Sequence, residues 1–255
     1  MQIKPQPLTP RHDIVQLVDE GLVAYNAGRL REICWLLREV LQNPNTTVGW
    51  SLSGALTPLG YGISIFAPLM QAGFIDYIVS TGANLYHDLH YSLQYEFDVR
   101  FPFKDDLTLR REERIRIYDV TFDASVLLET DKYVYRLLKN PEFRGKMGTA
   151  ELHYHMGKYV LETERQRGFA HHGLLATAYE LGAPLYCPAP TDGTIGLNLA
   201  ARHFFTDELE IDVVYDLNEF TALAWEARQD GKQSGVVILG GGVPKNYVLQ
   251  PGPQI

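Results

Sequence analysis

Three successive glycines, Gly240, Gly241 and Gly242, stand directly after a short apolar run that is typical of a buried strand. Glycine has no Cβ, so a ligand can lie against the backbone of such a turn, and the amides that begin a following helix can hold a pyrophosphate. The alternative is a tight turn required by packing alone. The G-x-G-x-x-G motif itself is missing, but the predicted strand-to-helix setting is the one in which such glycines bind dinucleotides.

Two other turns carry polar groups that could contact the same ligand. Thr191, Asp192 and Gly193 could place a carboxylate beside a ribose hydroxyl or a cationic amine, or could form an ordinary Asx turn. The turn Ser80–Ala83 could line a ligand site or could simply cap a helix. Each turn alone is a weak signal. Three such turns at the ends of predicted strands favour a cofactor site.

The histidines do not form a recognised metal-binding motif. His87 and His90 flank Asp88, but H-E-x-x-H is missing and the two cysteines, Cys34 and Cys187, are too far apart in the sequence to suggest a thiolate pair. We therefore predict no metal site. A serine hydrolase is also disfavoured because the sequence has no G-x-S-x-G elbow.

Composition sets the class of protein. The 255 residues are 45% hydrophobic and 21% charged, which is ordinary for one large globular domain. A formal net charge of −8 argues against a nucleic-acid surface and is compatible with a cationic substrate. No signal peptide and no run of roughly 18 apolar residues is found, so we expect a cytoplasmic protein without a membrane contact. Cys34 and Cys187 are expected to be free thiols.

The last third of the chain alternates strands with helices. Its predicted strands are 184–187, 211–215 and 236–239, and its predicted helices are 197–205 and 218–228. This rhythm predicts a Rossmann-like α/β fold, with a parallel sheet covered by helices on both faces. In such sheets, ligands bind beyond the carboxyl ends of the strands, where all three turns would lie.

The rest of the chain is expected to be mainly helical. Apolar spacing predicts an N-terminal segment of two helices within 12–41, broken near Asn26 and Gly28. A buried strand is predicted at 74–79 and a helix from Leu85. Glu112 and Arg116 have the i,i+4 spacing of an ion pair on a helix. Further helical character is found at 118–138, 149–165 and 169–181.

The combined turns resemble deoxyhypusine synthase, and more closely the bacterial deoxyhypusine synthase-like proteins. The matching blocks follow the family's order across most of the chain, and the last two are the most specific. They are Ser53 to Pro58 (SGALTP), Ile75 to Asn84 (IDYIVSTGAN), Pro188 to Gly196 (PAPTDGTIG) and Val237 to Lys245 (VILGGGVPK).

The resemblance implies an NAD-dependent transferase that moves an aminobutyl group from a polyamine, of the spermidine or putrescine class, through an imine intermediate. It also implies a homotetramer with sites at subunit interfaces; Tyr133, Tyr135 and Phe143 could anchor such contacts. Carried over by position, Thr81 and Gly82 would lie near the cofactor ribose, with Ala83 beside them. Asp192 would accept hydrogen bonds from the cofactor, and Gly240, Gly241 and Gly242 would face its phosphates.

Three positions depart from the pattern of the eukaryotic enzymes. The acid expected after Thr81 falls near His87, the acid expected after Asp192 is Leu197, and the histidine expected after the glycines is Asn246. His87 and Asn246 are therefore our candidates for substrate contact and catalysis. Leucine cannot make the charge-assisted hydrogen bond that an acidic side chain makes with an ammonium group. These changes therefore affect the polyamine-binding part of the expected site more than the cofactor-binding part, and the substrate could be a different amine.

The family's carrier lysine belongs to a later segment of the type P-x-E-A-x-S-W-G-K. We expect that segment to lie outside this sequence, which stops at Ile255, and Lys245 is not its equivalent. We expect residues 1–255 to form a single NAD-binding domain. Three explanations stay open: an incomplete chain, a second chain that supplies the segment, or a non-catalytic NAD-binding or regulatory subunit. A sirtuin-type enzyme is disfavoured because its zinc cysteines are missing.

Overall fold

The computed structural model describes residues 7, 9, 13–41, 43–99, 105–205 and 208–255, in two compact units, Met1–Thr46 and Thr47–Ile255. The N-terminal unit is helical, as predicted, with α1 (Ile14–Gln16), the π-helix η1 (Leu17–Gly21) and α2 (Tyr25–Leu41). The break lies before Tyr25, whose φ is 54°, and not at Asn26 and Gly28. Gly28 lies within α2, because one glycine inside a helix costs only about 1 kcal/mol.

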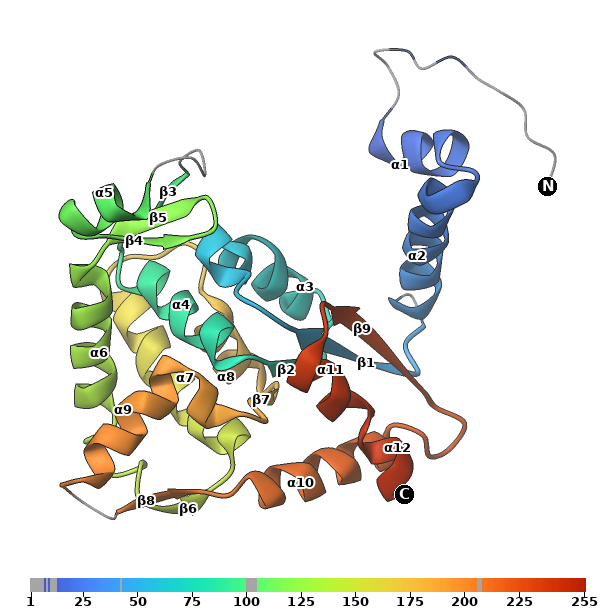
Figure 1. Cartoon of the computed structure of the whole chain (residues 1–255). Coiled ribbons are helices and arrows are strands. Elements are labelled where there is room, and N and C mark those ends of the chain that lie inside the picture. The colour runs from blue at the N-terminus through green and yellow to red at the C-terminus, as the bar shows by residue number, and fades with distance from the viewer. Residues whose placement is uncertain (1–6, 8, 10–12, 42, 100–104, 206–207) are drawn as a thin grey trace. The chain divides into compact units, whose positions relative to one another are not determined.

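The second unit is built on a four-stranded sheet in the order β7-β2-β1-β9 (Figure 1). The strands are β1 (Thr46–Leu52), β2 (Tyr77–Ser80), β7 (Leu185–Tyr186) and β9 (Gln233–Leu239). The pairs β1–β2 and β2–β7 are parallel, with Trp50 opposite Ile78 and Val79 opposite Tyr186. Leu52, Ile78 and Val79 are completely buried, as expected for strands covered on both faces. The predicted α/β class is confirmed.

Helices surround this sheet (Figure 1). Close packing between α7 (Thr149–Gln166) and α8 (Leu174–Leu181) depends on Gly157, because a Cβ there would lie 2.7 Å from the Cβ of Tyr179. The predicted helices at 149–165 and 169–181 correspond to α7 and α8. The helices of this unit outside the antiparallel layer are η2 (Thr57–Leu59), η3 (Gly62–Phe66), α3 (Ala67–Gln71), α4 (Gly82–Ser92), α7 (Thr149–Gln166), α8 (Leu174–Leu181), η4 (Pro190–Asp192), α9 (Thr194–His203), α10 (Val213–Glu226), α11 (Gly242–Leu249) and α12 (Pro251–Gln254).

A small antiparallel layer replaces part of the predicted helical middle. It consists of the sheet β3-β5-β4 with α5 and α6: β3 (Asp98–Val99), α5 (Asp106–Arg111), β4 (Arg114–Ile117), β5 (Val120–Asp123) and α6 (Ser125–Leu137). The expected Glu112–Arg116 helical pair is wrong, because Arg116 lies on β4 and pairs with Asp106 at 2.9 Å. Glu113, with a φ of 53°, ends the helix, and alternating apolar residues then favour strands.

The predicted strand at 211–215 is also wrong for most of its length. β8 (Leu209–Ile211) pairs with β6 (Gly145–Met147) in a separate two-stranded sheet. Asp212 then caps α10, because its carboxylate accepts the N–H groups of Val214 and Tyr215 at 2.9 Å each. The helix therefore starts at Val213, earlier than predicted. Among the residues that the structure describes, no helix is long and apolar enough to cross a membrane.

Candidate functional site

A cavity of about 280 Å³ lies where residues that follow all four strands of the main sheet come together. This is the position at which open α/β sheets bind ligands. The cavity contains most of the predicted cofactor-binding residues and adds the turn after β1, at Ser53 and Gly54. Its lining is Ser53, Gly54, Ser80, Thr81, Gly82, Cys187, Pro188, Ala189, Asp192, Gly241, Gly242, Val243 and Pro244.

The glycine turn requires glycine at two of its three positions. Gly240 and Gly242 have φ values of 88° and 71°, and a Cβ on Gly240 would lie 2.8 Å from the Cβ of Ser53. Gly241 differs: its φ is −141°, and a Cβ there would meet nothing within 4 Å. The Ser53 hydroxyl donates to the carbonyl oxygen of Gly241 and fixes the turn. A ligand can therefore approach the N-terminus of α11 across a backbone that carries no side chains.

Thr81 both caps α4 and lines the cavity. Its side-chain oxygen accepts the Asn84 N–H at 3.4 Å, and its hydroxyl donates to the carbonyl oxygen of Gly54 at 2.6 Å. The buried Asn84 side chain in turn accepts the Leu56 N–H at 2.6 Å. Thr81 therefore caps a helix, which was one of the two predicted roles of this turn. The same contacts also hold the turns after β1 and β2 together at the cavity, so the capping role does not exclude a ligand.

Asp192 lies at the end of η4 and is exposed in the cavity. Among the described residues, nothing donates a hydrogen bond to its carboxylate, so the turn is not held by an Asx contact. Gly193 follows and allows a close backbone contact, because a Cβ there would lie 3.0 Å from the Cα of Gly82. The carboxylate is therefore held at the cavity while remaining available to a ligand.

Cys187 forms an uncharged part of the cavity wall, a role that the sequence analysis missed. Its side chain is 2% exposed, and its backbone N–H donates to the Thr149 hydroxyl oxygen at 2.8 Å. Burial raises the pKa of the thiol to about 12, so the group is a neutral thiol and not a nucleophilic thiolate. A strand-end position next to Pro188 was the only signal in the sequence.

The remaining candidates lie outside the lining. Ala83 and Gly240 adjoin it, whereas Asn246 is exposed on α11. His87 lies on α4, one helical turn beyond Ala83. Leu197, which stands where the resemblance expects an acid, is 61% exposed on α9.

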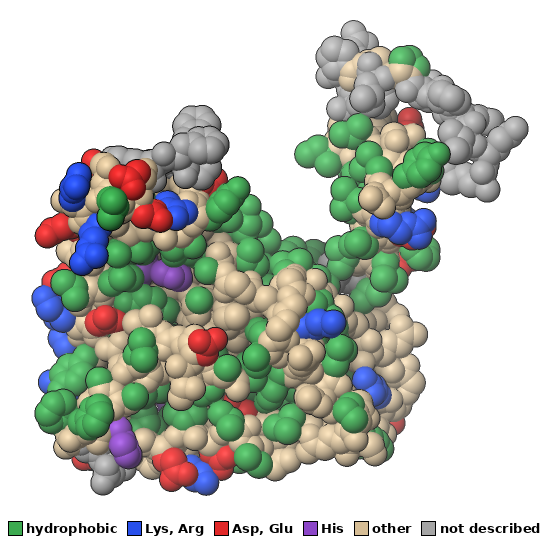
Figure 2. Space-filling view, in the orientation of Figure 1, with side chains coloured by type: hydrophobic (Ala, Val, Ile, Leu, Met, Phe, Trp, Pro, Cys, Tyr) green, Lys and Arg blue, Asp and Glu red, His purple; other side chains and the backbone are tan. Residues whose placement is uncertain are grey.

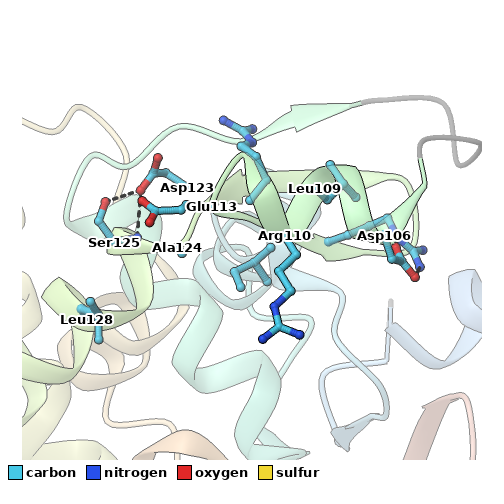
Figure 3. A pocket seen from close by; sticks show the side chains of 11 residues that line it. Asp106, Leu109, Arg110, Glu113, Asp123, Ala124, Ser125 and Leu128 are labelled. Atoms are coloured by element: carbon cyan, nitrogen blue, oxygen red, sulfur yellow. Dashed lines mark hydrogen bonds and ion pairs between the residues drawn. The ribbon is translucent and has the colours of Figure 1, made fainter.

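A larger cavity, of about 660 Å³, lies in the antiparallel layer between α5, β4 and the start of α6. Figure 3 shows Arg110 extending into this space, with Asp123 bonded to Ser125 on one side. Arg116 is paired with Asp106 inside the lining, and none of the described lining residues is a glycine. Without a strand-end glycine turn, this cavity lacks the features that bind a dinucleotide, and we place the candidate site at the smaller one.

The smaller cavity suits part of a dinucleotide. Typical small-ligand pockets measure about 300–1,000 Å³, so 280 Å³ accommodates the phosphates and a neighbouring ribose more readily than a whole dinucleotide. The Cβ-free surface at Gly241 and the start of α11 fit the phosphates, and the Asp192 carboxylate fits a hydroxyl donor.

A family profile and curated relatives identify the same family for this chain. A family profile described as deoxyhypusine synthase matches residues 16–253. The chain is 52% identical to a deoxyhypusine synthase-like protein of Thermosynechococcus vestitus over 99% of this chain and 64% of that protein. It is 50% identical to one of Nostoc punctiforme, over 100% of this chain and 65% of that protein. It thus spans about two thirds of the length of these curated relatives.

More distant relatives extend the match. "Probable deoxyhypusine synthase 1" of Methanosarcina acetivorans is 32% identical over 97% of this chain and 74% of its own length. A crystal structure described as a candidate deoxyhypusine synthase from Entamoeba histolytica superimposes with a TM-score of 0.67 at 16% identity, covering 94% of this chain and 80% of that one. The structural match supports the fold alone.

Proposed function

Because this chain belongs to the deoxyhypusine synthase family, we propose that it acts in NAD-dependent transfer of an aminobutyl group from a polyamine of the spermidine or putrescine class. The observation that supports this proposal best is the cavity at the strand ends. It joins the glycine turn, the Thr81 turn and the free carboxylate of Asp192 at one place.

The proposal assigns a role to each group of residues that lines the cavity. Gly241, Gly242 and the first amides of α11 would hold the pyrophosphate, and Thr81 with Gly82 would lie beside a ribose. Asp192 would accept a hydrogen bond from a cofactor hydroxyl or from the amine. The chemistry that NAD supplies at such a site is reversible acceptance of a hydride from the carbon beside an amine nitrogen. Cys187 would keep this wall uncharged and dry.

The alternative is an NAD-binding or regulatory subunit that transfers nothing. It is favoured by the lining, which contains no lysine among the described residues; Lys245 is exposed on α11 outside the cavity. NAD binding by calorimetry without NADH formation upon addition of spermidine or putrescine would support this alternative. Amine-dependent NADH formation would exclude it.

Asp192→Asn tests whether the carboxylate binds or merely shapes the turn. The change keeps the size of the side chain and removes its charge, so we expect a loss of about 2–3 kcal/mol in NAD binding or in transition-state stabilisation. NAD affinity and amine-dependent NADH formation would be measured for both proteins. Asp230→Asn, at an exposed turn with a φ of 55°, is the control and should change neither. Equal values for wild type and Asp192→Asn would reduce Asp192 to a turn residue.

We also propose a homo-oligomer, as the family resemblance implies, although on different surface residues. Phe143 is completely buried, and the Tyr133 hydroxyl lies 3.0 Å from that of Thr163, so neither is a free anchor; Tyr135 is 40% exposed. Exposed apolar side chains instead gather on β9 and α11, at Val236, Ile238, Leu239, Val243 and Leu249. Light scattering should give a mass well above 28.9 kDa at micromolar concentration, and a monomer would contradict the proposal.

A further inference from the structure

The side chain of Asn84 on α4 is completely buried beside the cavity and does not line it. Its oxygen, Oδ1, accepts the N–H groups of Leu56 at 2.6 Å and of Thr57 at 3.4 Å. Its nitrogen, Nδ2, donates to the Leu52 carbonyl oxygen at 3.4 Å and to the Thr81 hydroxyl oxygen at 3.1 Å. One carboxamide therefore bridges the two ends of the turn after β1.

The turn that Asn84 bridges is the one that lines the cavity at Ser53 and Gly54. The side chain of Asn84 is bonded to the residue just before this pair and to the residue two positions after it, so the loop is closed on both sides. Within the loop, the Ser53 hydroxyl donates to the carbonyl oxygen of Gly241. The placement of the glycine turn at the cavity therefore depends on the same loop.

The Thr81 hydroxyl is the second group that Asn84 fixes. A threonine hydroxyl has one hydrogen to donate and two lone pairs that accept. The hydroxyl donates to the Gly54 carbonyl oxygen at 2.6 Å, and it accepts the backbone N–H of Asn84 at 3.4 Å and its Nδ2–H at 3.1 Å. All three positions are used, so this hydroxyl holds the turns after β1 and β2 together and is not left to bond a ligand.

The surroundings of Asn84 require one acceptor and one donor on the same short side chain. They present N–H groups on one side and the Leu52 carbonyl oxygen on the other. An ionised aspartate has two acceptors and no donor, and it would place a charge in a buried site beside that carbonyl oxygen. A protonated aspartic acid has the same shape and again offers one acceptor and one donor. The site therefore distinguishes the two protonation states of an aspartate at this position.

We propose that Asn84 is a positioning residue for the cofactor: by closing the loop after β1 and fixing the Thr81 hydroxyl, it sets the geometry of the cavity at which NAD binds. The part that concerns NAD rests on the proposed function; the closure of the loop does not. Asn84 acts through the residues that line the cavity and does not touch the ligand.

The closure of the loop is tested in the ligand-free protein by amide hydrogen exchange, followed by NMR. We expect the Leu56 N–H to exchange at least about tenfold faster in Asn84→Ala than in the wild type, because its acceptor is removed. The Ile78 N–H, bonded to the Pro184 carbonyl oxygen at 3.0 Å beside the sheet, is the control for general loosening of the fold. Equal exchange of Leu56 in both proteins, or acceleration of both amides by the same factor, would overturn the loop closure.

The role in cofactor binding is tested with Asn84→Asp, by calorimetry with NAD between about pH 5 and 8. At pH 8 we expect NAD to bind at least about tenfold more weakly than to the wild type, because the introduced carboxyl is ionised. The difference should shrink as the pH falls, because burial favours the protonated form of that carboxyl. Asn84→Ala regains no donor, so its affinity relative to the wild type should stay low at every pH. Asp88, one helical turn along α4, and Asp192, at the cavity, are present in all three proteins, so their effects cancel in the comparison.

Val134→Ala separates positioning from loss of stability. Val134 is completely buried on α6 and does not line the cavity, so thermal unfolding should show a destabilised protein that binds NAD as the wild type does. Unchanged NAD affinity in Asn84→Asp at pH 8, or a loss that acid does not reverse, would overturn the positioning role. Failure of the wild type to bind NAD would refute the proposed function instead and leave the Leu56 exchange result standing.

Discussion

Replacing Gly241 by valine is expected to lower NAD affinity by at least about a thousandfold while leaving the protein folded. Gly241 has an extended φ of −141°, which any residue adopts, and its Cβ direction is open for 4 Å. The valine side chain would therefore occupy the cavity that we assign to the pyrophosphate instead of clashing with the protein. Calorimetry with NAD measures the loss, and circular dichroism with thermal unfolding measures the fold.

Two other glycines provide matched comparisons. Gly252 on α12 is equally open but does not line the cavity, so Gly252→Val should retain NAD affinity. Gly240→Val should instead destabilise the fold, because its φ is 88° and its Cβ would lie 2.8 Å from that of Ser53. A folded Gly241→Val protein that binds NAD as tightly as the wild type would exclude this placement of the pyrophosphate.

The turns that form the cavity were predictable because their signals are local. Glycines that need a positive φ, such as Gly240 and Gly242, and a capping residue such as Thr81 can be recognised without knowing the partner strands. That the Asp192 carboxylate is left free by its own turn was not predictable, because an Asx turn has the same residue types.

The turn after β1, at Ser53 and Gly54, was not predicted to line the cavity, and β1 itself was not predicted as a strand. β1 has the sequence TTVGWSL, whose polar residues and glycine do not resemble a central strand. Gly49 is needed because a Cβ there would collide with the Tyr77 ring of the neighbouring strand, and Ser51 is completely buried. Both facts depend on a partner that is distant in the sequence. Ser53 and Gly54 could be assigned to the cavity only after this pairing was known.

In the antiparallel layer, a local sequence signal led to a wrong prediction because packing between strands outweighs it. Charges at i,i+4 spacing suggested a helix through Arg116, but Ile115 pairs with Phe122 and Arg116 with Thr121 across β4 and β5. Phe122 is completely buried, so cross-strand packing outweighs the small benefit of a surface ion pair.

Asp88, which is buried beside a second carboxylate, Glu164, should make the stability of the fold depend on pH. Asp88 and Glu164 are 1% and 0% exposed, and both face the N-terminus of α8. Glu164 accepts the Gly173 N–H at 3.1 Å and lies 2.8 Å from His172, whereas Asp88 accepts the Leu175 N–H at 3.1 Å. Burial raises the pKa of Asp88 from 3.8 to about 7, with the neighbouring charge of Glu164 acting in the same direction.

A carboxyl whose pKa is raised by folding binds its proton more tightly in the folded state. Its contribution to stability is therefore full below pH 4 and is lost as the pH rises from about 4 to about 7. Each pH unit in this window is worth about 1.4 kcal/mol per proton, which gives an upper limit of about 4 kcal/mol. Asp88→Asn keeps an acceptor for Leu175 and cannot ionise, so it should remove this loss.

We therefore expect the free energy of unfolding of Asp88→Asn, minus that of the wild type, to increase by a few kcal/mol between pH 4.5 and 7 and then to level off. Denaturant unfolding at a series of pH values measures the difference, and any constant effect of the substitution cancels in its slope. Asp106→Asn is the control: Asp106 is exposed, and its hydrogen bond to Arg116 lowers its pKa, so its difference should not rise with pH. A constant difference for Asp88→Asn would show that Asp88 is ionised throughout, stabilised by the α8 amides despite its burial.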